Sequence, residues 1–223
     1  PVLVGASATT TQKSLQLAQH AQRAGASAVF IMPPEAWGGT LMEEVSADKM
    51  LAHYAALCEI LEIPLMIHAI KSMDVPFFET LLERFPQVKY IKEETSHGIK
   101  LRQYVRQLSD RVTIFGPGLH YPAELEWGAR GVMPSCCAPH THARVFDLWE
   151  EGRPEDARRE WNRMLPLVFW RWHTASQEAG KMYLVEQGIF KTRLCRPEMG
   201  TLKLDEADRQ EMLRVLEAMG RPY

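Results

Sequence analysis

The residue best suited to chemistry is Lys92, which ends a short apolar stretch at residues 88–92. That stretch has the composition of a β-strand, and alternate strand residues share a face, so Val88, Tyr90 and Lys92 point the same way. An ammonium group held beside apolar neighbours loses hydration, which favours its neutral, nucleophilic form. The stretch therefore predicts an amine nucleophile. The alternative is a lysine at a strand end whose ammonium group reaches water.

Histidines and cysteines are the other residues that could do chemistry. His140 and His142 follow His120 and the adjacent pair Cys136 and Cys137. These are zinc ligands by type, and a zinc site would indicate a metal-dependent aldolase. The histidines fall in expected loops without a matching carboxylate or cysteine spacing, so the sequence favours no metal site.

Alternating strands and helices would position these residues. Six stretches have the composition of strands: residues 2–6, 28–32, 64–69, 88–92, 112–115 and 131–134. Helical spacing marks residues 15–24, 46–61, 75–85, 100–108 and 122–129 between them. Such alternation predicts parallel strands, in either an open doubly wound sheet or a closed (β/α)₈ barrel. No GxGxxG or GxxxxGK[ST] motif is present, which weakens a nucleotide-binding interpretation.

The remainder of the chain is expected to be helical. Amphipathic spacing covers residues 145–151, 154–172, 176–187 and 205–219. We therefore predict a β/α barrel portion at residues 1–143 and a helical extension at residues 144–223. Trp161, Trp170 and Trp172 in that extension favour packing between helices or subunits over ligand binding.

Composition excludes several classes of function. The net charge of −2 over 223 residues gives no electrostatic footprint for nucleic acid. No apolar run has the roughly 18 residues that a membrane span requires, so no membrane is expected. Four cysteines without CxxC spacing indicate reduced thiols in a cytoplasmic protein. The chain begins with Pro1 inside an apolar stretch, which we interpret as a fragment or a processed start.

An ordered set of motifs resembles the dihydrodipicolinate synthase and N-acetylneuraminate lyase family of class I aldolases. The motifs are Pro1-Val2-Leu3-Val4-Gly5, Ala24-Gly25-Ala26-Ser27-Ala28-Val29, Ile31-Met32-Pro33-Pro34, Ile63-Pro64-Leu65-Met66-Ile67, Tyr90-Ile91-Lys92-Glu93 and Gly128-Ala129-Arg130-Gly131-Val132. The resemblance implies a (β/α)₈ TIM barrel with extra C-terminal helices and a homo-oligomer, tetramer or dimer. It also implies that the first two β/α units are missing here, since six strands cannot close an eight-stranded barrel.

The same resemblance implies a chemical role for Lys92. At this position the family has the lysine that forms a Schiff base with a 2-keto acid or pyruvate. The resulting iminium acidifies the adjacent C3 protons, which enables carbon–carbon cleavage or loss of water. This chemistry requires no metal and no cofactor, so none is expected.

Other site residues follow from the motifs and from one departure. His68 occupies the place where the family commonly has a tyrosine proton shuttle, and a histidine there could relay protons or merely fill the space. Lys71-Ser72-Met73 replaces an arginine-containing turn of the synthases. The substrate-binding residues expected beside the lysine are Glu94, Thr95, Gly116, Gly118 and Ser135. For Glu94 and the glycines, the alternatives are a solvated loop carboxylate and plain turn geometry.

These features predict a Schiff-base lyase. The chain resembles most the sugar-acid dehydratase branch, of the keto-deoxyarabonate type, in its Met-Pro-Pro turn, in Lys92-Glu93-Glu94-Thr95 and in Phe115-Gly116-Pro117. Loss of water from a 2-keto-3-deoxy sugar acid is therefore the expected reaction. Two alternatives are a pyruvate-releasing aldolase or synthase-like enzyme, and a non-catalytic barrel that binds sugar acids.

Overall fold

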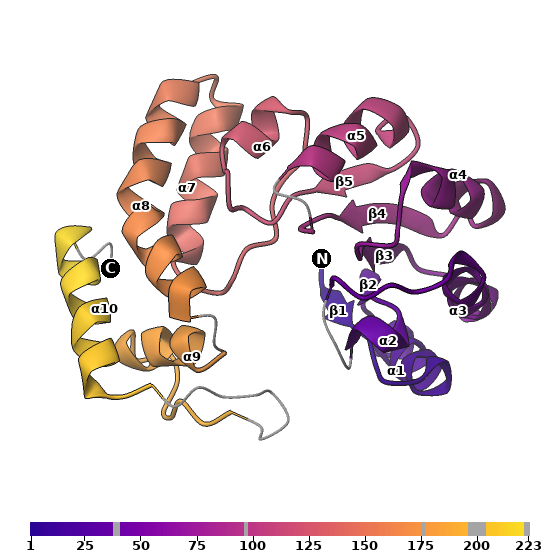
Figure 1. Cartoon of the computed structure of the whole chain (residues 1–223), viewed down its shortest axis with the longest axis horizontal. Helices are drawn as coiled ribbons and strands as arrows, with labels where there is room; N and C mark the ends of the chain where they lie inside the picture. The colour runs from indigo at the N-terminus through magenta and orange to yellow at the C-terminus, as the bar shows by residue number, and fades with distance from the viewer. Residues whose placement is uncertain (38–40, 96–97, 175–176, 196–203, 221–223) are drawn as a thin grey trace. The chain divides into compact units, whose positions relative to one another are not determined.

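The computed structural model describes residues 1–37, 41–95, 98–174, 177–195 and 204–220, and the chain divides into two compact units, 1–133 and 134–223. Strands and helices alternate in the first unit, and the described part of the second is helical (Figure 1). The expected boundary at residue 143 falls inside helix α7, Pro139–Glu150. This helix packs against α8, Pro154–Thr174, so it belongs with the second unit.

The first unit contains five described strands and six helices. The strands are β1 (Leu3–Gly5), β2 (Ala28–Ile31), β3 (Leu65–His68), β4 (Val88–Lys92) and β5 (Thr113–Phe115). The helices are α1 (Thr11–Arg23), α2 (Pro34–Trp37), α3 (Ala47–Ile60), α4 (Val75–Arg84), α5 (Ile99–Leu108) and α6 (Ala123–Glu126). The second unit adds α7 and α8, then α9 (Gln177–Glu186) and α10 (Glu206–Ala218).

The strands form one parallel sheet in the order β1-β2-β3-β4-β5, as the alternation predicts. The expected sixth strand, 131–134, is wrong: it is reduced to a single bridge between Gly116 and Val132. Proline explains the loss, because Pro117 and Pro134 have no N–H group to extend the ladder. An eight-stranded barrel whose first two units are missing stays a prediction, since the described strands form a five-stranded sheet.

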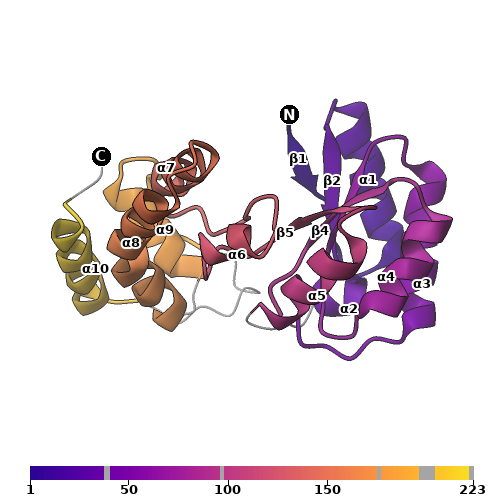
Figure 2. The same ribbon diagram turned by 90° about the horizontal axis from the view of Figure 1, so that it is seen from above.

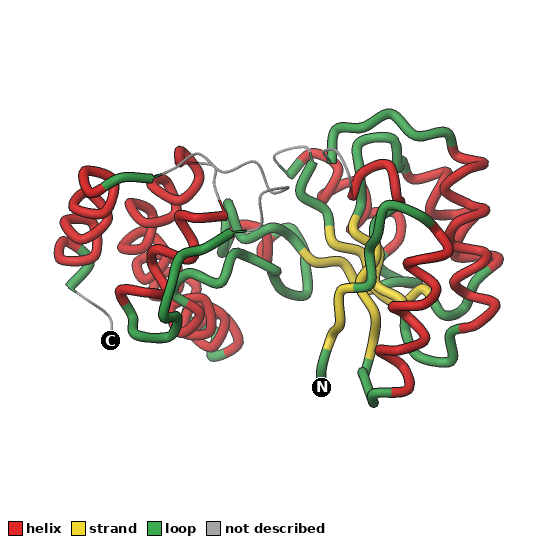
Figure 3. The backbone as a smooth tube through the Cα atoms, turned by 90° about the horizontal axis from the view of Figure 1, so that it is seen from below, coloured by secondary structure: helices red, strands yellow, loops and turns green. Residues whose placement is uncertain are grey.

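One face of the sheet is packed against helices. Ile31, Ile67, Ile91 and Ile114 come from four neighbouring strands, and each is at most 1% exposed within the main hydrophobic core. α1, α3, α4 and α5 lie along this side of the sheet (Figures 2 and 3). Burial of branched side chains on this face is the main stabilising contribution to the unit.

The opposite face carries a different set of residues. Phe30, His68, Lys92 and Phe115 come from β2, β3, β4 and β5, and we call this side the site face. They share a face because strand residues alternate and the register aligns His68 with Lys92 and Lys92 with Phe115. The Phe30 and Phe115 rings therefore lie on the same face of the sheet as the amine and the imidazole.

Helix starts follow the sequence signals closely. Side chains at the N-caps accept backbone N–H groups: Thr10 from Lys13, Ser46 from Lys49, Asp74 from Phe77, and Asp205 from Ala207 and Asp208. Such caps satisfy amides that have no partner within the helix, and each contributes about 1 kcal/mol. The N-cap side chains therefore define the first residue of each of these helices more precisely than apolar periodicity does.

The second unit is held by packing of α8 against α7, α9 and α10. Trp161 and Trp170 are buried within it, in agreement with a packing role. The side chain of Trp172 lies outside the described residues, and so does the expected helix start at residue 176. Within the described ranges, no helix is long and apolar enough to cross a membrane.

A buried histidine makes the first unit sensitive to acid. His53 on α3 is 3% exposed, its Nδ1 lies 2.9 Å from the Thr11 hydroxyl of α1, and burial lowers its pKa to about 4. The unfolded chain binds this proton near pH 6.5, so His53-linked stability is complete above pH 6.5 and is lost as the pH falls toward 4. The shift corresponds to roughly 3 kcal/mol.

Urea unfolding of the wild type and of His53→Gln between pH 4 and 7 measures this linkage. We expect the stability difference between the two proteins to shrink by about 3 kcal/mol as the pH falls. A difference that stays constant across this range would contradict the assignment.

Candidate active site

The end of β4 brings together three side chains that could do chemistry. Lys92 is the last residue of β4, and His68 is the last residue of the neighbouring β3 and its register partner. Glu94 follows β4 by two residues and reaches back to both. Parallel strands place such terminal residues at the same edge of the sheet, where α/β enzymes build their sites.

Glu94 bridges the other two groups. One carboxylate oxygen lies 2.7 Å from Lys92 Nζ, and the other lies 2.8 Å from His68 Nε2. The side chains of Lys92 and His68 are 11% and 8% exposed, so the contacts are largely shielded from water. Because an ionised carboxylate only accepts hydrogen bonds, Nε2 carries the proton and donates it. The sequence alternative of a solvated loop carboxylate is therefore wrong for Glu94.

The charge of Glu94 is fixed by its two partners. Burial alone would raise its pKa, but the hydrogen bond from His68 and the charge of Lys92 outweigh burial and lower the pKa to about 2. The carboxylate is therefore ionised across the physiological range. The ion pair places a carboxylate beside the Lys92 amine, whereas the strand pattern indicates apolar neighbours alone. The amine must give up a proton before it can attack a carbonyl.

His68 is positioned by an aromatic neighbour. Its ring stacks on Phe30 with 4.9 Å between ring centroids and 27° between the planes. Nδ1 is buried, and among the described residues it has no hydrogen-bond partner. With Nε2 donating to Glu94, Nδ1 is left with an unshared lone pair in the interior.

Thr95 contacts a different carboxylate from the one that binds the lysine. Its backbone N–H and its hydroxyl both donate to Glu93 Oε1, at 2.7 and 2.6 Å. Glu93 is 1% exposed, and sequence reasoning missed it because strand alternation assigns it only to the face opposite Lys92. Its contacts fix the turn that carries Glu94 back to the lysine.

The amides of the Gly116–Gly118 turn are already bonded within the chain. Gly116 donates to the Gly131 carbonyl at 3.1 Å, and Gly118 donates to Glu124 Oε2 at 2.8 Å. A Cβ atom at Gly116 would lie 2.1 Å from the Glu124 carboxylate, so a larger residue there would displace that side chain. Glu124 is 1% exposed, and burial raises its pKa although the backbone N–H groups of His120 and Gly118 donate to it. Binding of a substrate by these amides would require the bonds to break.

The remaining sequence predictions fall partly in the second unit. Ser135 belongs to that unit, so its contact with substrate stays a prediction. His142 is buried, its Nδ1 donates to the Ala138 carbonyl at 3.0 Å, and burial lowers its pKa. Across the described residues, no three His, Cys, Asp or Glu side chains come together as a metal-binding group.

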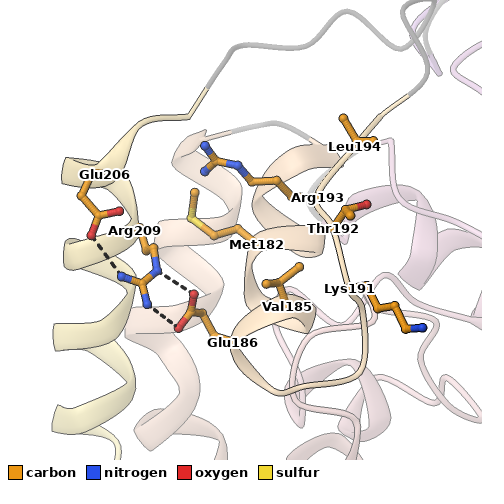
Figure 4. A pocket seen from close by; sticks show the side chains of 9 residues that line it. All are labelled: Met182, Val185, Glu186, Lys191, Thr192, Arg193, Leu194, Glu206 and Arg209. Atoms are coloured by element: carbon orange, nitrogen blue, oxygen red, sulfur yellow. Dashed lines mark hydrogen bonds and ion pairs between the residues drawn. The ribbon is translucent and has the colours of Figure 1, made fainter.

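A hollow in the second unit involves none of the predicted site residues. It has a volume of about 520 Å³ and lies between α9, α10 and residues 191–194 (Figure 4). Arg209 crosses it with a bidentate ion pair to Glu186, at 2.6 and 2.9 Å, and a third contact to Glu206 at 3.0 Å. These ion pairs join α9 to α10, so helix packing accounts for the charged side chains in the hollow.

Fold and site together define the class of protein. A parallel sheet covered by helices on one face carries a buried amine, a carboxylate and an imidazole at the carboxyl ends of adjacent strands. This is the arrangement of α/β enzymes whose chemistry takes place at that edge.

The chain belongs to the dihydrodipicolinate synthetase family, which it matches over residues 1–219. This family consists of lyases, among them synthases, aldolases and dehydratases. The chain is 28% identical over 225 residues to L-2-keto-3-deoxyarabonate dehydratase from Azospirillum brasilense, covering 96% of this chain and 71% of that protein. It is 24% identical over 227 residues to 4-hydroxy-tetrahydrodipicolinate synthase from Syntrophus aciditrophicus strain SB, covering 99% and 75%.

A solved structure confirms the fold. YagE, a prophage protein of the dihydrodipicolinic acid synthase family from E. coli K12 in complex with pyruvate, superposes with a TM-score of 0.85 at 19% identity. The superposition covers 99% of this chain and 75% of that one. The expected family and the parallel α/β fold are thus confirmed.

Proposed function

We propose that this chain is a Schiff-base lyase that removes water from a 2-keto-3-deoxy sugar acid. The observation that supports the proposal is the contact of Glu94 with both Lys92 and His68 at one edge of the sheet. An amine, a proton acceptor and a carboxylate are the groups that iminium formation and C3 deprotonation require.

The proposed first step forms the iminium. Lys92 passes a proton to the pair of Glu94 and His68, and the neutral amine attacks the C2 carbonyl of the keto acid. The carbonyl oxygen leaves as water, so the C2–oxygen bond is replaced by a C2–nitrogen double bond. Because the proton stays on Glu94 or His68, the total charge of the three groups does not change when the amine becomes neutral.

The proposed second step uses Glu94 together with His68. The Glu94 carboxylate accepts a C3 proton, and the electrons of the C3–H bond move to the iminium nitrogen to give an enamine. The enamine electrons then form a C3–C4 double bond as the C4 hydroxyl leaves, and Glu94 returns the proton so that the hydroxyl leaves as water. Hydrolysis of the new imine by one water then returns Lys92 and releases the product. Phe30 restricts the imidazole ring by stacking, which would hold Nε2 toward the Glu94 carboxylate.

The dehydratase assignment is supported by the relative from Azospirillum brasilense and by the turn after β3. In this turn Lys71 pairs with Glu44 at 2.6 Å, and the Ser72 hydroxyl donates to the Glu43 carbonyl at 2.8 Å. The synthases resembled here have an arginine in the corresponding turn, so their second carboxylate-bearing substrate is not proposed.

Two other functions give different outcomes in an activity assay. A retro-aldolase would release pyruvate, and a non-catalytic barrel would bind a sugar acid without turnover. Homo-oligomer formation and a cytoplasmic location stay predictions.

The test is reductive trapping of the chain with pyruvate and borohydride, followed by peptide mapping. We expect a stable adduct on Lys92 that adds the mass of pyruvic acid less one oxygen atom, since imine formation loses water and reduction adds two hydrogens. An adduct confined to other lysines would overturn the proposal. Product analysis with 2-keto-3-deoxy sugar acids then separates dehydration from release of pyruvate.

A further inference from the structure

Lys100 and Tyr104 on α5 both bind the turn that follows β3, residues 69–73. The Lys100 ammonium group donates to the backbone carbonyls of Lys71 and Met73, the second at 2.8 Å. The Tyr104 hydroxyl donates to the same Met73 carbonyl at 2.6 Å, and this side chain is fully buried. Residues four positions apart lie on one face of a helix, so α5 presents both donors to one turn.

The position of Lys100 is unfavourable for an isolated helix. It is the second residue of α5, whose first turn contains no acidic side chain, and a helix N-terminus carries a partial positive charge. Burial lowers the pKa of Lys100, and the charge of Glu93 is the largest effect that opposes burial. Asp74 and Glu44 act in the same direction as Glu93. Tertiary neighbours therefore hold an ammonium group where the helix alone disfavours one.

The turns after β3 and β4 carry the site residues. Backbone pairing of the two strands continues to the Ala69 N–H group, which donates to the Lys92 carbonyl at 2.9 Å. Among the described residues this is the last backbone hydrogen bond between them, and the contact of His68 with Glu94 lies directly beside it. Beyond that point, side-chain contacts determine how the two turns lie against each other.

Glu93 makes the connection from the turn after β4. It is 1% exposed and accepts the backbone N–H group and the hydroxyl of Thr95. Its charge acts on both Lys100 and Tyr104. The turn that contains Glu94 is therefore held by a carboxylate that attracts Lys100, the residue that binds the other turn.

We propose that Lys100 and Tyr104 are positioning residues for the candidate active site. By binding the turn after β3 and facing Glu93 in the turn after β4, they keep Glu94 within hydrogen-bond distance of His68. They act through backbone carbonyls and Glu93 rather than on a substrate. Their role in turnover rests on the proposed lyase function, whereas their effect on His68 is measured without substrate.

Nitrogen-15 NMR of the histidine rings in the full chain, at pH 8 and without substrate, measures this effect. In the wild type we expect His68 to keep its proton on Nε2, because that atom donates to the Glu94 carboxylate. Lys100→Met retains an unbranched side chain but removes the donors, so part of the His68 population should move to the Nδ1–H tautomer. The His68 signal is assigned by its absence in His68→Asn.

Turnover of the same variant measures the consequence for catalysis. We expect Lys100→Met to lower kcat by about 10- to 10²-fold and to change KM by less than about twofold, since misplaced groups slow proton transfer more than they weaken binding. Pyruvate should still be trapped on Lys92. Lys100→Arg retains a cation that can donate to both carbonyls, so it should restore most of the lost turnover.

A second α5 variant and a matched control complete the test. Tyr104→Phe removes one hydroxyl donor and provides the same comparison if Lys100→Met does not fold. It should change the His68 tautomer and kcat in the same direction by a smaller factor. Lys49→Met removes an exposed lysine from the first turn of α3 and should change neither quantity.

The outcomes separate this inference from the proposed function. An unchanged His68 tautomer in the folded α5 variants, whatever their loss of stability in urea, would overturn the positioning role and leave Lys100 and Tyr104 a purely structural one. Absence of both turnover and a Lys92 adduct in the wild type would instead remove the proposed lyase function, and the tautomer comparison would still decide the positioning role.

Discussion

Replacement of Lys92 with arginine should abolish turnover and borohydride-trapped adduct while the fold is retained. Arginine keeps a positive charge at the position whose amine lies 2.7 Å from the Glu94 carboxylate in the wild type. Its guanidinium remains protonated at neutral pH and forms no Schiff base. The larger side chain should change the free energy of unfolding by no more than about 2 kcal/mol. Turnover assays, adduct mapping and urea unfolding on the same preparation measure all three quantities.

A second substitution at the same position distinguishes loss of chemistry from loss of the ion pair. Lys92→Met also removes the amine, but it leaves the Glu94 carboxylate without its cation, which should cost about 3 kcal/mol of stability. The two variants should therefore be equally inactive and unequally stable. Residual turnover in Lys92→Arg would remove Lys92 from the mechanism.

Glu94→Gln should lower turnover by about 10²- to 10⁴-fold, the range typical of a lost proton-transfer group. Glutamine keeps the shape of the side chain but cannot carry the charge that links Lys92 to His68. The trapped pyruvate adduct should still form, because the variant retains the Lys92 amine. Steady-state kinetics and borohydride trapping provide the two readouts.

The control removes an ion-paired carboxylate elsewhere in the same unit. Glu44→Gln breaks the exposed pair with Lys71 and should leave activity within about twofold, because such surface pairs contribute little. The double variant Glu94→Gln with His68→Asn should be no slower than the worse single variant if the two groups act as one relay. Additive losses would show that they act separately.

Local signals determined much of the fold. Apolar stretches bounded by glycine and proline specify where strands form, and Thr10, Ser46 and Asp74 specify where helices begin, because the effects involve neighbours in the chain. The sixth strand was not predictable in this way. Whether Gly131 to Pro134 extends the ladder depends on Gly116 and Pro117 in the partner segment, which are distant in sequence.

The same distinction between local and long-range effects applies to the site residues. Residue type and position at a strand end identify Lys92 and His68, because alternation and parallel pairing determine which face and which edge they occupy. Glu94 was expected near them, but the sequence could not show that one carboxylate contacts both groups. It also could not show that Glu124 occupies the Gly118 amide or that Glu93 binds Thr95.

The sequence by itself thus determined the parallel α/β class, the family, and a lysine at the end of its fourth strand, since these depend on local pattern and motif order. Only the tertiary structure decided the electrostatics. Bringing Lys92, Glu94 and His68 within hydrogen-bond distance out of water fixes a carboxylate charge with a pKa of about 2. Such a shift depends on distances and burial in three dimensions, which a one-dimensional pattern does not contain.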